Sequence, residues 1–284
     1  ISGISVAEIL CREGKSVLLL EKNTLLASET SKVFHEWMHS GALYSLLPDN
    51  LLTLRYLLGA TDDLFEYYSG YQGMNLCTTE TGVTVLGDGW FNSERIEFRY
   101  RVRRFNPIWM SLVSRSINII DMINSHDWLR RKAGSEYGKS KVKNKHSFNK
   151  ISEQFLSKKS FYNKVSPDMT MNSRVLISDL VSLAKNNGLI VKTSSSVLDI
   201  KEKSESVVVK TPDEQFNANN VVVCSPDLLS KMDRIPIKVS FAPIAVVENV
   251  PKSEKSFVEL DYKVKTCINL LIKSIPVLPG YHRR

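Results

Sequence analysis

The sequence predicts an α/β protein in which a parallel sheet with covering helices forms one domain and an antiparallel sheet forms a second. Three observations lead to this class. A helix followed by a short apolar strand opens the chain, residues 82–103 alternate in the manner of antiparallel strands, and helical and strand-like segments return between residues 172 and 224. A chain that leaves its first sheet and later returns to it builds a discontinuous domain.

The opening segment carries the clearest pattern. Its apolar residues share one helical face: Ile4, Ala7, Leu10 and Cys11. Gly14 ends this helix, and residues 16–20 form a continuous apolar run of strand length, as in a strand buried on both faces of a parallel sheet. Glu21 follows at the carboxyl end of that strand.

The remaining elements follow from the same periodicities. Helices are predicted at residues 49–68, 107–130 and 172–187, the last ending at Gly188. Further strands are predicted at 190–193, 197–200, 207–209, 221–224 and 236–248. The predicted domains are residues 1–75 with 172–235, and residues 76–171 with 236–284.

Composition excludes several classes of protein. The 284 residues carry a net charge of +8 and 43% hydrophobic residues, which is an ordinary globular composition. There is no apolar run long enough to cross a membrane. The basic runs, among them the lysines of residues 139–145, lack the interleaved aromatics of a nucleic-acid-binding module, so we expect no nucleic-acid partner. The chain opens on Ile1, inside a structural element, as expected of a fragment.

The cysteines predict neither a metal site nor disulfides. Cys11, Cys77, Cys224 and Cys267 are scattered, with no C-x-x-C pair. We interpret them as structural thiols in a reducing compartment and expect a cytoplasmic protein.

Gly3 and Glu21 fit a dinucleotide-binding unit. In the G-x-G-x-x-G motif the third glycine allows helix and strand to pack closely, and an acidic residue about 20 residues further on binds the ribose hydroxyls. Glu21 follows Gly3 by eighteen residues and closes the strand. A carboxylate there repels a 2′-phosphate, which favours FAD or NAD over NADP. The alternative is a surface glutamate on a Rossmann-like strand that binds another ligand.

Residues 1–22, with Gly3, Ala7, Gly14 and Glu21 at their spacing, resemble the opening of FAD-dependent oxidoreductases of the D-amino-acid oxidase superfamily. The resemblance implies a Rossmann-like FAD-binding domain with a second, antiparallel-sheet (α+β) substrate domain. It also implies FAD contacts from this segment, at Ser2, Gly3, Glu21 and Lys22.

Two later stretches are similar to the same superfamily. Residues 27–31, leading to the H-x-G-x-x-Y segment at 39–44, resemble the part of glycerol-3-phosphate and 2-hydroxyglutarate dehydrogenases that passes beneath the flavin. Residues 197–209 and 219–224 are similar to the second FAD-contacting block, although Ser225-Pro226 stands where the family usually has glycine. These likenesses imply further cofactor contacts at Ser28, Thr30, Ser31, Gly41, Val197, Cys224 and Ser225.

The chemistry that FAD implies requires few protein groups. The flavin accepts a hydride from a substrate C–H bond, and His35 and His39 are the candidates for proton transfer, because histidine titrates near neutrality. Four arginines on the predicted substrate-domain strands would suit an anionic carboxylate or phosphate substrate: Arg99, Arg101, Arg103 and Arg104.

Three functions therefore stay open at this point. The first is an FAD-dependent dehydrogenase or oxidase of a small amino or hydroxy acid, with the electron acceptor unspecified. The second is a flavin-dependent enzyme of other chemistry, such as a sugar mutase or a desaturase. The third is a non-catalytic FAD-binding protein that has kept the fold.

Overall fold

The computed structural model describes residues 1–29, 31, 37–47, 51–79, 82–103, 105–125, 151–154, 157–233, 256–261 and 268–270. The chain divides into two compact units. Unit 1 comprises Ile1–Phe34 and Ser173–Val246, and unit 2 comprises His35–Asn172 and Val247–Arg284. Each unit is discontinuous in the sequence, so the chain leaves unit 1 after its first segment and returns to it for α6.

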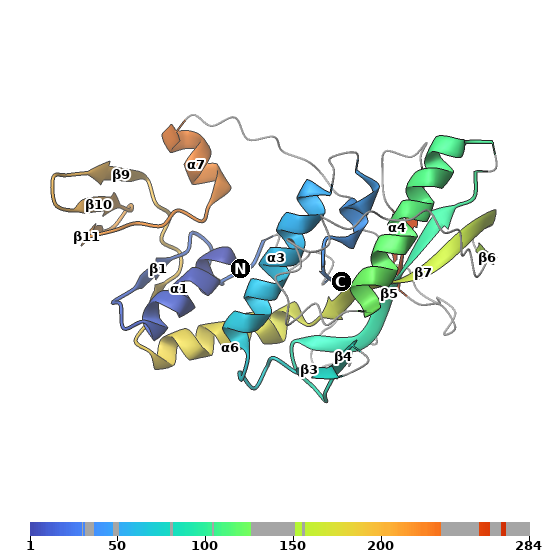
Figure 1. Ribbon diagram of the computed structural model, residues 1–284. Helices are drawn as coiled ribbons and strands as arrows, with labels where there is room; N and C mark the ends of the chain where they lie inside the picture. Colours follow the sequence, from blue (N-terminus) through green and yellow to red (C-terminus); the bar gives the residue numbers. More distant parts are fainter. Residues whose placement is uncertain are drawn as a thin grey trace, which may run out of the picture. The chain divides into compact units, whose positions relative to one another are not determined.

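A parallel pair of strands with two helices forms the centre of unit 1 (Figure 1). β1 (Leu18–Leu20) pairs in parallel with β8 (Ile190–Lys192), and α1 (Ser2–Arg12) lies along α6 (Ser173–Asn186). The buried residues of this core are small or apolar: Ala7, Cys11, Ala184 and Leu189, with Val17, Leu19 and Val191 packed against them. Because alanine faces alanine between the helices, the two backbones can approach closely.

A three-stranded antiparallel sheet completes the strands of unit 1. It has the order β11–β10–β9 and consists of β9 (Asp199–Glu202), β10 (Val207–Lys210) and β11 (Gln215–Ala218). Residues 221–225 then lead, without strand pairing, to α7 (Pro226–Asp233).

Unit 2 is built on a long, mainly antiparallel sheet of order β13–β12–β5–β7–β2, with β6 also paired to β7. Its strands are β2 (Trp37–Met38), β5 (Phe91–Arg101), β6 (Ile151–Gln154), β7 (Ser157–Met171), β12 (Phe257–Leu260) and β13 (Ile268–Leu270). Only the β12–β5 pair of this described sheet is parallel. The register between β5 and β7 shifts near Arg95, which indicates a β-bulge there.

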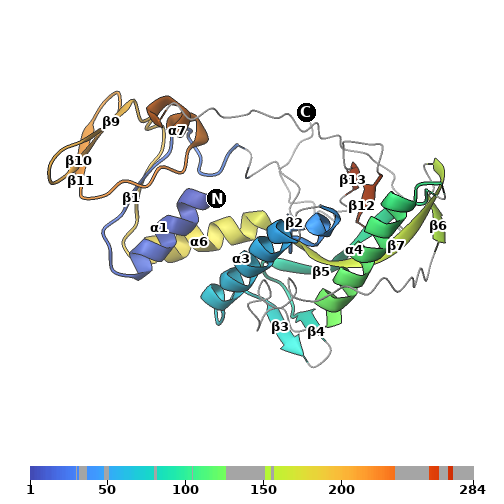
Figure 2. The same ribbon diagram turned by 45° about the horizontal axis from the view of Figure 1, so that its top comes forward.

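Helices and one hairpin surround this sheet. α4 (Pro107–Ser125) packs against β7 and against the 3₁₀ helix η1 (Ala42–Leu46), and α3 (Leu52–Tyr68) also contacts η1 (Figure 2). β3 (Leu76–Thr79) and β4 (Gly82–Val85) form the hairpin. The core contains large side chains that are fully buried, among them Trp90, Phe98, Tyr100, Ile120 and Phe161.

The predicted fold class is confirmed: unit 1 contains the parallel pair and unit 2 the mainly antiparallel sheet. The strand predicted at 221–224 is wrong, because these residues have no ladder partner among the described strands and Val222 is 60% exposed. The strand predicted at 236–248 lies outside the described residues. The predicted domain boundaries differ from the two units, since residues 37–75 fall in unit 2, where β2 pairs with β7.

Within the described part of the chain, no helix has the length and apolar character needed to cross a bilayer.

Candidate functional site

The start of α1 is the first part of the candidate site, and it contains Ser2 and Gly3. α1 begins at Ser2, and the amide groups in the first turn of a helix carry the partial positive charge that favours anions. A Cβ atom added to Gly3 would lie 3.4 Å from Cβ of Cys224 and 3.7 Å from Cδ1 of Leu19. The structure therefore brings the predicted cofactor residues Gly3 and Cys224 together, and a side chain larger than a methyl group would not fit between them.

Glu21 lies where the prediction requires it, directly after β1. Its backbone N–H donates to the Lys192 carbonyl at 2.9 Å, and its own carbonyl accepts from the Ser195 N–H at 2.8 Å. Oε1 accepts two hydrogen bonds from Asn23, from the backbone N–H at 2.9 Å and from Nδ2 at 3.0 Å. No described residue donates to Oε2. Asn23 thus holds Oε1 of the carboxylate in place, while Oε2 can accept a hydrogen bond from a hydroxyl group.

Lys22 connects the loop after β1 to the start of α7. Its Nζ lies 3.0 Å from Glu29 and 3.6 Å from Asp227. The hydrogen bond and charge of Glu29 raise the pKa of Lys22. In this structure Lys22 is thus an ion-pair partner of two acidic side chains.

The other predicted cofactor residues of unit 1 lie on loops. Ser28 follows Ala27, whose φ of 53° marks a left-handed turn, and Ser31 lies three residues further along the same segment. Val197 lies two residues after Ser195, whose backbone N–H donates to the Glu21 carbonyl. The last of them, Ser225, precedes α7, and its carbonyl accepts from the Leu229 N–H at 3.1 Å. Thr30 lies outside the described residues.

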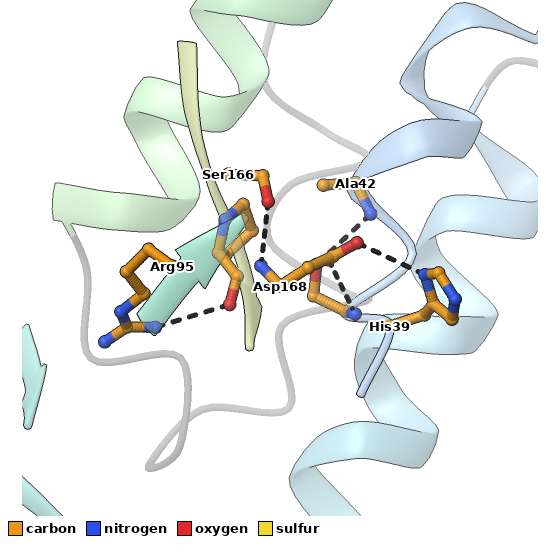
Figure 3. Close-up of polar contacts among 7 residues, drawn as sticks. His39, Ala42, Arg95, Ser166 and Asp168 are labelled. Carbon is orange, nitrogen blue, oxygen red and sulfur yellow. Dashed lines mark hydrogen bonds and ion pairs between the residues drawn. The ribbon is translucent and has the colours of Figure 1, made fainter. Parts of the chain in front are cut away.

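His39 belongs to unit 2, where its imidazole faces a buried carboxylate (Figure 3). Nδ1 of His39 lies 3.2 Å from Oδ2 of Asp168. The Asp168 side chain is 1% exposed, whereas that of His39 is 36% exposed. The imidazole therefore contacts a buried group, while part of the His39 side chain remains exposed. His35, the second histidine predicted to act in proton transfer, lies outside the described residues.

Gly41 shapes the backbone beside His39. Its φ is +89°, and an added Cβ would lie 2.7 Å from Cβ of Leu57. Only glycine combines this left-handed conformation with so close an approach. The turn directs the Ala42 N–H to Ser40 Oγ at 3.2 Å. Gly41 thus has a structural role beside the cofactor role that the resemblance implies.

The predicted anion-binding arginines differ in their surroundings. Arg99 is buried, pairs with Glu97 at 2.9 Å and stacks on Phe257 at 3.8 Å. Arg103 forms a two-point ion pair with Asp261. Arg104 lies outside the described residues.

Arg101 differs from these because its buried Nε and Nη1 atoms have no hydrogen-bond acceptor among the described residues. It lies opposite Phe161, however, and this position is seven residues from Asp168 along β7, or roughly 20 Å at the usual strand rise. One small molecule does not span that distance, so Arg101 and His39 do not contact the same small substrate.

Asp168 is the residue that the sequence analysis missed. It lies 129 residues from His39 in the chain, and its neighbour Pro167 interrupts the strand pattern that would have drawn attention to β7. Within the described residues, no group of three or more His, Cys, Asp or Glu side chains is placed to hold a metal ion.

Comparison with known proteins identifies the family. The profile of the FAD dependent oxidoreductase (DAO) family matches residues 1–266, so the chain belongs to this family. No curated protein matches the sequence significantly.

Solved structures with a similar fold include L-proline dehydrogenase from P. horikoshii, with 12% identity and a TM-score of 0.51 over 90% of this chain and 61% of that one. Glycine oxidase from Geobacillus kaustophilus has 14% identity and a TM-score of 0.47 over 81% of this chain and 54% of that one. The chain thus spans little more than half the length of these structures.

Proposed function

We propose that this protein binds FAD through unit 1 and oxidises a small amino or hydroxy acid, with His39 as the proton acceptor. The observation that carries the proposal is the arrangement around β1: the start of α1, the close packing of Gly3 on Cys224, and the Glu21 carboxylate, whose Oε2 has no donor among the described residues. Family membership supports the same cofactor.

The residues of unit 1 fit the two polar parts of a dinucleotide. The amide groups at the start of α1 would bind the pyrophosphate, since the first N–H groups of a helix point along its axis at the positive end of the helix dipole. Oε2 of Glu21 would accept a hydrogen bond from a ribose hydroxyl, while Asn23 keeps the carboxylate in place through Oε1. Ser28, Ser31, Val197 and Ser225 are proposed as further contacts from the loops around this centre.

The role proposed for His39 in the oxidation is to accept the proton that the substrate releases. When bound, FAD provides a ring that accepts a hydride from a substrate C–H bond. Oxidation of an amine or alcohol also releases the proton of its N–H or O–H group, which needs an acceptor. We assign this role to His39 because it is the histidine of the H-x-G-x-x-Y segment and its side chain, which contacts Asp168 through Nδ1, is 36% exposed.

An anionic substrate is part of the proposal. Arg95 lies opposite Met169 in the sheet and donates to the Pro167 carbonyl at 3.4 Å, so its guanidinium is close to the segment that carries Asp168 (Figure 3). Burial lowers the pKa of Arg95, and a nearby carboxylate would offset the cost of burying its charge. The amino and hydroxy acids carry such a carboxylate.

The cofactor part is tested by the visible spectrum of the purified full-length protein. After incubation with FAD and removal of the excess, we expect the absorbance bands of bound flavin and a stoichiometry of about one per chain. A protein that retains no flavin after reconstitution would contradict the proposal.

The substrate part is tested by anaerobic addition of amino and hydroxy acids to the flavin-loaded protein. We expect at least one acid to bleach the flavin absorbance, and the matching amine or alcohol without a carboxylate to be at least tenfold slower. Tight FAD binding with no bleaching across a broad panel would favour the non-catalytic alternative. Turnover of a substrate without net flavin reduction would favour a mutase.

We also propose a cytoplasmic location. Cys11, Cys77 and Cys224 are free thiols, and burial raises the pKa of Cys11. Free thiols persist in a reducing compartment. Fluorescence microscopy of the tagged full-length protein would test this, and secretion or organelle targeting would contradict it.

A further inference from the structure

We infer that Arg101 and Asn163 form a second ligand-binding site in unit 2, for a small carboxylic acid that carries a hydroxyl or ammonium group next to its carboxylate. The site goes beyond the proposed oxidation, because the position of Arg101 on the sheet lies roughly 20 Å from Asp168 at the usual strand rise. It is formed by β5 and β7, and it requires neither His39 nor bound flavin.

Arg101 and Asn163 lie on the same face of the sheet. Arg99 is directly opposite Asn163 and Arg101 is directly opposite Phe161, with no register shift between the two pairs. Opposed residues of an antiparallel pair point to the same side, as do residues two apart on one strand. Arg101 and Asn163 are therefore diagonal neighbours, about 7–8 Å apart and within reach of a shared ligand. Tyr100 points to the other face, where its hydroxyl bonds to α4.

Buried polar atoms of both side chains have no hydrogen-bond partner among the described residues. These atoms are Nε and Nη1 of Arg101 and Oδ1 of Asn163. Proteins pair nearly all such atoms, because an unpaired buried group loses the hydrogen bonds that water would make with it. As whole residues, Arg101 and Asn163 are only partly buried, so a ligand can reach them from the surface.

The arginines two positions before and after Arg101 already have acidic partners. Nε of Arg99 donates to Glu97 at 2.9 Å, and Nε of Arg103 donates to Asp261 at 3.1 Å. Arginine keeps its positive charge in proteins. Arg101 is therefore a cation whose buried N–H groups lack the anionic acceptor that its two neighbours have.

The unpaired atoms define the chemistry of the ligand. A guanidinium binds a carboxylate through its planar set of N–H donors, and the Phe161 ring, 5.5 Å from Cζ of Arg101, supports the group from one side. Oδ1 of Asn163 is only an acceptor, so the ligand also needs a donor. 2-Hydroxy and 2-amino acids combine both groups, whereas a fully ionised phosphate or sulfate has acceptors alone and leaves Asn163 unpaired.

Calorimetric titration of the full-length protein with three matched acids tests the ligand class. 2-Hydroxyisobutyrate and 2-aminoisobutyrate carry the two donors in question, and neither has a C–H bond beside its carboxylate from which a hydride could leave. Pivalate has a methyl group in place of the donor. We expect the better of the first two to bind at least about tenfold more tightly than pivalate, because pivalate leaves Oδ1 of Asn163 unpaired. In Asn163→Leu this preference should fall to within about twofold.

Arg101→Met tests the guanidinium in two ways. The affinity for the preferred acid should fall by at least about tenfold. Without ligand, the melting temperature should stay the same or rise, because the variant removes a charge that has no described partner. Arg101→Lys keeps the charge but not the planar set of donors, and should bind with intermediate affinity. Arg115→Met, the matched change on α4, should leave the affinity unchanged.

Three results would overturn the inference: no binding of either isobutyrate by the wild-type protein, unchanged affinity in Arg101→Met, or equal affinity of the wild type for pivalate. Unchanged affinity in the variant would place the acid elsewhere, such as near His39. If Arg101→Met does not fold, Arg101 has a structural role, and the affinity of Arg101→Lys then decides whether it also binds the acid. None of these measurements needs flavin reduction, so a failure of the proposed oxidation leaves the test intact.

Discussion

The two units position their candidate functional residues in different ways. In unit 1 the important residues are close in sequence: Gly3, Glu21 and Asn23 lie within one helix–strand–loop segment. In unit 2 the His39 imidazole contacts Asp168, which lies 129 residues away and is brought beside it by the pairing of β2 with β7. The candidate residues of unit 1 are therefore close together because they are close in sequence. Those of unit 2 are brought together by the tertiary fold. From this difference we expect substitutions in unit 1 to affect mainly FAD binding and substitutions in unit 2 to affect mainly the stability of the fold.

Gly41→Ala should give the largest effect and should act on the stability of unit 2. The new Cβ would be 2.7 Å from Leu57, at a φ of +89°. We expect a loss of about 3 kcal/mol in the free energy of unfolding, from backbone strain and overpacking together. Chemical denaturation measures it.

Gly70→Ala is its matched control, because Gly70 has a φ of +86° but open space around the added Cβ. It should cost only about 1 kcal/mol. Equal losses in the two variants would show that the contact with Leu57 does not matter.

Gly3→Leu should act on cofactor binding in unit 1. The side chain would enter the space against Cys224 and Leu19, and would move α1 away from β1 where the pyrophosphate is proposed to bind. We expect FAD affinity to fall by at least about 30-fold, or about 2 kcal/mol. Quenching of flavin fluorescence measures the affinity. Gly3→Ala, whose Cβ would meet Cys224 at 3.4 Å, should bind FAD within a few-fold of the wild type.

Gly59→Ala is the smallest change and should stabilise the protein. Gly59 lies inside α3, and an added Cβ would meet nothing within 4 Å. Alanine favours the helix over glycine by up to about 1 kcal/mol. A small rise in the melting temperature with unchanged FAD affinity is expected. A loss of FAD binding would instead connect α3 to the cofactor, against the division of roles described above.

The sequence predicts unit 1 well because its signals are local. Apolar spacing identifies α1 and the strand after it, and Gly188, with a φ of +90°, ends the helix that the periodicity predicts at residues 172–187. The exception is residues 221–224, whose β-branched run predicts a strand although none of the described strands pairs with it. A strand forms only beside another strand with which it can pair, and the β propensity of a segment does not tell whether such a strand is present.

The site in unit 2 escapes prediction for a related reason. β7 carries lysine, serine and asparagine on both sides of its apolar residues, and Pro167 lies where the register with β5 shifts. Such a strand shows no clean alternation, so neither β7 nor Asp168 stands out. His39 stands out through its motif, whereas its contact partner Asp168 is brought to it by long-range strand pairing.

The most direct test of the account is a calorimetric titration of the full-length protein with FAD, beside the variant Glu21→Ala. We predict one FAD per chain in the wild type, and an affinity lower by roughly 10- to 100-fold in the variant, because a charged acceptor of a ribose hydroxyl is lost. Glu205→Ala, an exposed glutamate between β9 and β10, should leave the affinity unchanged. Equal FAD affinity of the wild type and Glu21→Ala, or no binding of FAD by the wild type, would contradict the account.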